Sequence, residues 1–203
     1  MSSVPARSRL PAAERRAAVL NAALSVFGEG SYDGATTADI ARAGGVSEPI
    51  LYRHFGCKRD LYVACLDEMW TRLREAVEQI VAAEPDPREW LFAVPKAIAL
   101  LRGKGVLPNQ LWIQALSEAG EDPEIRRYLR RHMREVHDFM ADLYRRAQAE
   151  GAMSADRDPE AEAWIGLGIG LLRSVQDRLG GLLTPEDFAA ILNARRASLL
   201  DTS

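Results

Sequence analysis

Three large polar side chains, Tyr52, Arg53 and His54, stand in a row within the stretch GVSEPILYRHF. A tyrosine hydroxyl and an imidazole can donate hydrogen bonds to phosphate oxygens, and a guanidinium can pair with a guanine edge. Lys58 adds a cation close by, and Glu48 can accept a hydrogen bond from a cytosine amino group. A helix that only covered a core would not need these residues. Their types and spacing therefore favour contact with nucleic acid.

Two short helices joined by a glycine turn must position these side chains. Residues 36–43 (TTADIARA) and 47–55 (SEPILYRHF) have helix-forming patterns, and Gly44-Gly45-Val46 separates them. Thr36 and the aspartate three residues later form a capping box, and Ser47 is expected to cap the second helix. Two short helices around a tight turn that contains glycine predict a helix-turn-helix.

The apolar residues of this motif show which face of the second helix points outward. Ile40, Val46 and Leu51 are placed to pack the two helices together. With those residues inside, the side chains that project together from the other face are Glu48, Pro49, Tyr52 and Arg53. Such a face has the size that enters a DNA major groove. Thr37 begins the preceding helix, where a hydroxyl and a backbone N–H can meet a phosphate.

Helical periodicity extends through the rest of the chain, and strand signals are nearly absent. We expect an all-α fold of about nine helices: 12–28, 37–43, 48–54, 58–83, 87–102, 105–119, 123–150, 159–180 and 185–200. Asp122, Asp158 and Thr184 each precede a proline and an acid, which predicts a helix start. We predict a boundary near residue 57, giving a DNA-binding domain over 1–57 and a larger helical domain over 58–203.

Composition indicates an ordinary globular protein, with 47% hydrophobic and 27% charged residues and a net charge of −3. Residues 1–60 carry eight Lys or Arg and six Asp or Glu, so the acidic balance lies in the remainder. No apolar run approaches the roughly 20 residues of a membrane span, and the N-terminus lacks an apolar signal segment. We expect a cytoplasmic protein with no membrane partner. Two cysteines, Cys57 and Cys65, do not make a disulfide framework.

The stretch TTADIARAGGVSEPILYRHFGCKRDLY resembles the DNA-binding signature of TetR-family transcriptional regulators. The resemblance covers residues 20–62, about a quarter of the chain. It implies a homodimer, a palindromic operator in double-stranded DNA, and a C-terminal pocket whose small-molecule effector alters DNA affinity.

The family's residue roles carry over onto matching positions. The implied phosphate contacts are Thr37, Tyr52, His54 and Lys58, and the implied base-face residues are Glu48, Pro49 and Arg53. Ile50 departs from the family pattern, which often has a small or polar residue there. It would either touch a thymine methyl group or pack inward. The N-terminal arginines, Arg7, Arg9, Arg15 and Arg16, form either an arm that enters a minor groove or a solvated tail.

The glycines in Gly166-Leu-Gly-Ile-Gly170 do not have the strand and spacing of a nucleotide-binding loop. Inside a helix, Gly166 and Gly170 lie one turn apart and allow close helix packing. Because TetR-family dimers form through their last two long helices, we predict a dimer interface at Gly166, Gly170, Leu171 and Val175. Leu167, Leu171, Val175 and Leu179 could equally be core.

Aromatic residues of the C-terminal domain are the best sign of an effector pocket. We predict that Trp112, Gln114, His137 and Phe139 line it, although the same residue types also build cores. His132 and His137 lie five residues apart and do not share a helix face, so we expect no metal site. No cofactor is expected.

Two classes of function remain open. The first is a DNA-binding regulator, most simply a repressor, that an apolar or amphipathic effector releases from its operator. The second is an all-α enzyme or small-molecule-binding protein with an incidental helix-turn-helix. The sequence offers no nucleophile–base pair or metal cluster for an enzyme, and we expect none. A third possibility is a protein-interaction module with no role in DNA binding. The residues Tyr52, His54 and Lys58 argue against it.

Overall fold

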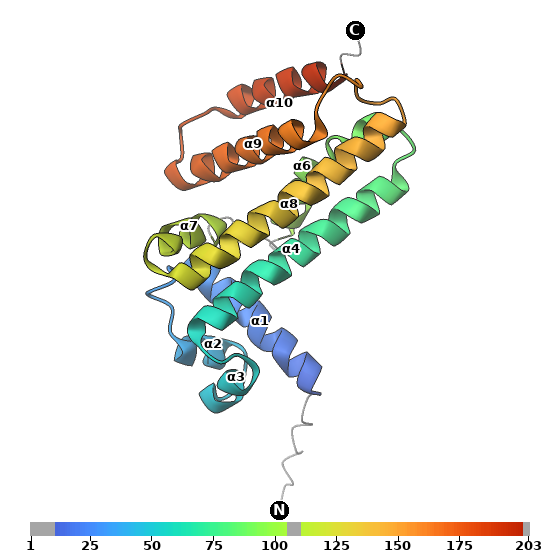
Figure 1. The fold of residues 1–203 in the computed structure, drawn as a ribbon. Helices are drawn as coiled ribbons and strands as arrows, with labels where there is room; N and C mark the ends of the chain where they lie inside the picture. Colours follow the sequence, from blue (N-terminus) through green and yellow to red (C-terminus); the bar gives the residue numbers. More distant parts are fainter. Residues whose placement is uncertain (1–10, 105–110, 201–203) are drawn as a thin grey trace, which may run out of the picture. The chain divides into compact units, whose positions relative to one another are not determined.

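The computed structural model describes residues 11–104 and 111–200, and every regular element in these ranges is an α-helix (Figure 1). The helices are α1 (Ala12–Glu29), α2 (Thr37–Ala43), α3 (Glu48–His54), α4 (Lys58–Ala83), α5 (Pro87–Trp90), α6 (Ala93–Gly103), α7 (Leu111–Glu121), α8 (Pro123–Ala149), α9 (Pro159–Leu179) and α10 (Pro185–Leu200). The predicted all-α fold is confirmed. The start predicted for the sixth helix, residue 105, lies outside the described residues.

The predicted helix over 87–102 is wrong, because two helices occupy this stretch. α5 ends at Trp90 and α6 begins at Ala93. Pro95 explains the break: in a continuous helix its ring would clash with the carbonyl of Leu91, and it has no N–H to offer that carbonyl. In the first turn of α6 the missing N–H costs nothing, since first-turn N–H groups have no partner inside the helix.

The predicted caps of the long helices are confirmed. The Asp122 carboxylate accepts hydrogen bonds from the N–H groups of Glu124 and Ile125 at the start of α8. Asp158 accepts from Glu160 N–H at the start of α9. Before α10, Thr184 and Asp187 bond each other's backbone N–H groups reciprocally. These bonds satisfy N–H groups that a helix start otherwise leaves without partners.

The chain divides into two compact units, one ending at Leu66 and the other beginning at Asp67. The division falls inside α4, and the functional boundary predicted near residue 57 stays a prediction. In the first unit, one face of α1 is buried, as its periodicity predicts. The core of this unit contains Val19, Leu20, Ala23, Leu24, Phe27, Ile40, Ala41, Leu51, Phe55, Leu61, Tyr62 and Cys65.

In the second unit, α8 has two buried sides. Met140 and Tyr144 belong to a cluster with Ala163 of α9 and Leu91. Leu143 belongs to another cluster, with Val77 of α4 and Ala97 of α6. Helix α8 therefore lies between the two clusters and organises this unit.

The last two helices leave much of their apolar surface in solvent. Within α9 only Glu162 and Ala163 are buried, and within α10 only Leu199 is buried. Exposed apolar side chains on and just after α9 are Trp164, Ile165, Val175, Leu179 and Leu182. Among the described helices, none combines the length and apolar character needed to cross a membrane.

Candidate nucleic-acid interface

The turn between α2 and α3 is a Schellman motif with glycine at its left-handed position. The N–H of Val46 bonds the carbonyl of Ala41 at 3.0 Å, and the N–H of Gly45 bonds that of Arg42 at 3.2 Å. Gly45 has φ +65°, a value that side chains with a Cβ rarely adopt. The turn thus ends α2 and sets the direction of α3 through backbone bonds alone.

Close packing fixes this motif on α1. A Cβ on Gly44 would lie 3.3 Å from the Cα of Val19, so a larger residue would push α2 away from α1. At the other end of α2, Thr36 caps the helix by accepting from Asp39 N–H. The hydroxyl of Thr36 donates to the Asp39 carboxylate, and this bond is the main reason that the pKa of Asp39 is lowered. The predicted capping box is confirmed.

Ser47 does not cap α3 through its side chain, and that prediction is wrong. Ser47 occupies the N-cap position with extended backbone, but its hydroxyl makes no cap hydrogen bond. An N-cap side chain usually accepts a hydrogen bond from the backbone N–H two or three residues later. Two residues after Ser47 stands Pro49, which has no N–H to donate. The N–H of Ile50 instead bonds the Ser47 carbonyl at 2.9 Å.

Leu51 is fully buried on the inner face of α3, and Phe55 is buried directly after the helix. On the other side Pro49 and Arg53 are exposed, and Tyr52 retains 46% of its accessible surface. The structure therefore presents these three side chains together, as the apolar pattern predicts. Their contacts with bases or phosphates stay predictions.

A chain of hydrogen bonds joins α2 to α3 at one edge of this face. The Thr37 hydroxyl donates to Glu48 Oε1 at 2.6 Å and lies 3.0 Å from the Tyr52 hydroxyl. Because Thr37 has one proton and gives it to the carboxylate, Tyr52 is the donor in the second contact. Two predicted phosphate contacts and one predicted base contact are thus bonded to one another in the free protein.

Lys58 and His54 occupy different surroundings. The Lys58 ammonium lies 4.5 Å from the centre of the Tyr32 ring and donates to the Asp33 carbonyl at 3.4 Å. These contacts hold the side chain of the first residue of α4. His54 is half-buried near the C-terminal end of α3 and belongs to a pocket between α3 and α1.

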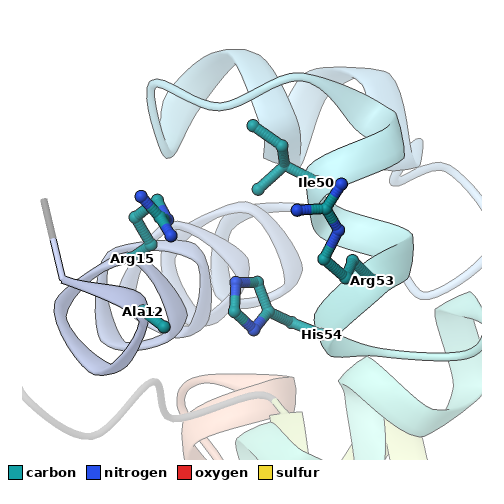
Figure 2. Close-up of a pocket in the computed structure, with 5 residues that line it drawn as sticks. All are labelled: Ala12, Arg15, Ile50, Arg53 and His54. Atoms are coloured by element: carbon teal, nitrogen blue, oxygen red, sulfur yellow. The ribbon is translucent and has the colours of Figure 1, made fainter. Parts of the chain in front are cut away.

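This pocket has a volume of about 300 Å³ and is lined by Ala12 and Arg15 of α1 and by Ile50, Arg53 and His54 of α3. Figure 2 shows the two α1 residues facing the three from α3. Ile50 is half-buried and forms a pocket wall, whereas its neighbour Leu51 fills the core. The sequence had left open whether Ile50 points to a base or packs inward.

Of the four N-terminal arginines, the structure describes two. Arg7 and Arg9 lie outside the described residues. Arg15 and Arg16 belong to helix α1, and the Arg16 guanidinium lies 5.0 Å from the centre of the Phe55 ring. Arg15 and Arg16 are therefore fixed on a helix rather than on a tail.

The predicted effector residues have different neighbours in the structure. His137 is buried against α9, where its ring stacks on Trp164 at 4.3 Å and its Nε2 contacts the Glu160 carbonyl. Phe139 packs edge-on against Trp70 of α4, 5.4 Å away. Two residues apart on a helix, they face different neighbours. Trp112 is half-buried and Gln114 buried, both on α7. Their role as pocket lining stays a prediction.

Sequence reasoning considered His132 only as a metal ligand and missed that it is buried inside the second unit. It is 4% exposed and lies between the ring of Trp70 and the ring of Tyr128, at 5.9 and 5.5 Å. Its Nδ1 has no hydrogen-bond partner among the described residues, and burial lowers its pKa. The Tyr128 hydroxyl donates to Asp67 at 2.8 Å. The spacing of Tyr128 and His132, four residues apart on a helix, was the available signal.

The predicted dimer residues separate into two kinds. A Cβ on Gly166 would lie 2.5 Å from Cε of Met140 and 3.0 Å from the hydroxyl of Tyr144, so this glycine serves packing of α9 on α8 within the chain. A Cβ on Gly170 would meet open space. Leu171 is half-buried and Val175 is 38% exposed. The interface itself stays a prediction.

One group of side chains has the spacing of metal ligands. Ligand atoms of His137, Asp138 and Glu160 lie within 4.8 Å of one another. The guanidinium of Arg145 already pairs with the Glu160 carboxylate, and His137 Nε2 already makes a hydrogen-bond contact with the Glu160 backbone carbonyl. A cation would have to displace these partners, so we assign the group to packing of α8 against α9.

Known proteins resemble this chain most closely in the helix-turn-helix region. Residues 19–65 match the model of bacterial regulatory proteins of the TetR family. The transcriptional activator FasR of Mycolicibacterium smegmatis is 40% identical over 90 residues, which are 44% of this chain and 41% of FasR. The regulator BetI of Rhizobium meliloti is 32% identical over 117 residues, 57% of each chain. The matched region thus spans about half of these relatives.

Solved structures match along nearly the whole chain. A TetR-family regulator from Rhodococcus sp. has a TM-score of 0.81 at 24% identity, covering 93% of this chain and 100% of that one. A regulator from Saccharomonospora viridis, solved in complex with choline, has a TM-score of 0.72 at 21% identity, covering 90% and 95%. These likenesses show the fold. The sequence match to the TetR family covers residues 19–65, which contain the helix-turn-helix of the first unit.

Proposed function

We propose that the chain is a dimeric, ligand-responsive regulator that binds a palindromic operator through α3. The observation that supports this most directly is the exposed face of Pro49, Tyr52 and Arg53 on a helix anchored by buried Leu51. The proposed base contacts are made by Glu48, Pro49 and Arg53, and the proposed phosphate contacts by Thr37, Tyr52, His54 and Lys58.

The test is a fluorescence-anisotropy titration against a library of genomic fragments at two salt concentrations. We expect one palindromic sequence to be enriched, and its binding to weaken on Tyr52→Ala. Half-sites about 34–36 Å apart would match a two-fold symmetric dimer. Absence of any enriched sequence, with weak binding that vanishes in modest salt, would contradict the proposal.

The exposed apolar residues of α9 support the proposed dimer. Ile165, Val175 and Leu179 are 48%, 38% and 67% exposed, a costly arrangement for a surface that stayed in water. We expect light scattering to give the mass of a dimer. A Leu179→Glu variant is expected to shift it toward the monomer mass. Leu116→Glu is the matched control, because Leu116 is 43% exposed on α7 and the substitution is the same.

The proposed effector binds in the second unit and shifts the protein toward a state with low operator affinity. The Nδ1 of His132 is a buried hydrogen-bonding atom beside the rings of Trp70 and Tyr128, and Phe139 packs on Trp70. This aromatic setting suits an apolar or amphipathic molecule. The choline complex of the Saccharomonospora protein supports a small-molecule ligand for this fold. A thermal-shift screen of amphipathic metabolites, repeated with His132→Phe, tests this site.

We propose repression as the mode of action, with effector binding releasing the operator. FasR carries the name of an activator, so the sign of regulation needs its own experiment. A reporter gene behind the enriched operator is expected to fall in expression when the protein is supplied. A rise in reporter expression would show activation instead.

A further inference from the structure

The pocket between α1 and α3 brings together three basic side chains from two helices. Arg15 comes from the first turns of α1, and Arg53 and His54 come from the end of α3. Figure 2 shows these groups arranged around one opening, with Ala12 and Ile50 as its apolar walls. No carboxylate is among the five residues that line it. A hollow lined in this way attracts an anion.

The chemistry of the lining selects the kind of anion. Guanidinium groups present paired N–H donors that match the oxygens of a phosphate group, and they stay charged at every physiological pH. The imidazole of His54 adds a further possible donor. Ile50 and Ala12 provide apolar surface beside the charged groups, as a deoxyribose would require. A volume of about 300 Å³ is ample for one phosphodiester group.

The position of the pocket on α3 connects it to the proposed DNA face. Arg53 is exposed beside Pro49 and at the same time lines the pocket. Glu48, the acid of α3, bonds Thr37 at the other edge and is absent from the pocket lining. Helix α3 therefore has an acidic edge toward α2 and a basic edge toward α1.

We propose that this pocket binds one backbone phosphate of the operator, next to the bases that α3 faces, and that Arg15 is a phosphate-anchoring residue. The inference rests on the proposed DNA-binding function. Arg15 then belongs to a site that α1 and α3 build together, and neither to a minor-groove arm nor to a solvated tail. Phosphate contacts of this kind set the position of a protein on DNA without reading its sequence.

The experiment compares Arg15→Gln with Arg42→Gln in the full-length protein. Arg42 lies on α2, is largely exposed, pairs with Asp39 and does not line the pocket, so its replacement makes the same charge change elsewhere. Operator affinity is measured over a series of salt concentrations. We expect Arg15→Gln to flatten the slope of log K against log salt by about 0.9 for each chain bound. It is expected to weaken operator and random DNA by the same factor.

A second measurement locates the phosphate. Single phosphates of the operator are replaced by neutral methylphosphonates, one position at a time. Wild-type protein is expected to lose affinity at one position in each half-site where Arg15→Gln protein does not. Equal urea unfolding midpoints for the two variants and wild type show that the fold is intact.

Each outcome decides a different point. Equal salt slopes for Arg15→Gln and Arg42→Gln, with wild-type operator binding intact, overturn the phosphate pocket and leave the proposed function standing. If the wild-type protein binds no operator, the phosphate pocket and the proposed function are both overturned. If inorganic phosphate raises the melting temperature of wild type but not of Arg15→Gln, while the DNA salt slope is unchanged, the pocket serves a free anion and the DNA assignment is wrong.

Discussion

Replacing Glu48 by glutamine is expected to tighten the binding of random DNA. In the free protein the Glu48 carboxylate takes the only proton of the Thr37 hydroxyl, at 2.6 Å, and Tyr52 donates to the same hydroxyl. A phosphate that approaches Thr37 must compete with this carboxylate for the proton. Glutamine keeps the shape and an acceptor oxygen but removes the charge.

The size of the effect follows from the strength of the bond that competes with phosphate. Hydrogen bonds to charged groups contribute about 1.5–3 kcal/mol, and neutral ones roughly half as much. Because the Thr37–Glu48 pair is only partly buried, the lower end applies, and the difference between about 1.5 and about 0.75 kcal/mol is about 0.75 kcal/mol. That difference corresponds to an affinity about 3.5-fold higher, since RT is about 0.6 kcal/mol.

The assay is anisotropy with a labelled duplex of random sequence and, separately, with the operator. Glu29→Gln is the matched control, because the Glu29 carboxylate also accepts a hydroxyl bond, from Ser25 at 2.8 Å, on α1. Both variants change the net charge equally, so the excess gain of Glu48→Gln measures the release of Thr37.

Equal gains for the two variants would refute the reasoning, since bulk charge would then explain the whole effect. The operator duplex answers a further question about Glu48. If its carboxylate accepts from a cytosine amino group, operator affinity falls while random-DNA affinity rises.

Three other changes give measurable outcomes. Burial lowers the pKa of His132, so the unfolded chain binds a proton at this residue before the folded chain does. The free energy of unfolding therefore decreases as the pH drops below about 6.5, by at most about 1.4 kcal/mol per pH unit. Urea unfolding of His132→Phe is expected to show a weaker decline between pH 7.5 and 5, and an unchanged decline would contradict this. The partners Arg196 and Lys96 lower the pKa of Glu89 to about 2, so its stabilising contribution is present above pH 4.5 and is lost as pH falls toward 2. Glu89→Gln should flatten acid unfolding in that window, and an acid profile equal to that of wild type would show that these ion pairs add nothing. Gly166→Leu should lower the melting temperature because its side chain meets Met140 and Tyr144, whereas Gly168→Ala, in open space, should raise it through a helix propensity gain of up to about 1 kcal/mol. The reverse order of melting temperatures would overturn the packing assigned to Gly166.

Short-range features of this fold could be predicted because their causes are local. The capping boxes at Thr36 and Thr184 and the left-handed Gly45 each depend on residues within a few positions. The division between α5 and α6 was also local, and Pro95 signalled it through its clash with a carbonyl four residues earlier. Helical periodicity could likewise have shown that His137 and Phe139 face different sides of α8.

Other features depend on contacts between residues far apart in sequence. The bond from Thr37 to Glu48 exists only because the Gly45 turn brings α2 against α3. The pocket of Arg15 with Arg53 requires the packing of α1 on α3, which no single helix pattern specifies. His132 lacked any sequence signal beyond its spacing from Tyr128, because its surroundings include Trp70 of another helix.

The division of labour along α3 bears on how operator specificity can change during evolution. Leu51 and Phe55 hold the helix in place, whereas Pro49 and Arg53 are exposed. Under the proposed function, substitutions at those two positions are expected to alter the recognised bases at little cost in folding. Duplicated copies of such a gene would then acquire new operators by a few exchanges there, and the same two positions would be the first to randomise when a designer retargets the protein.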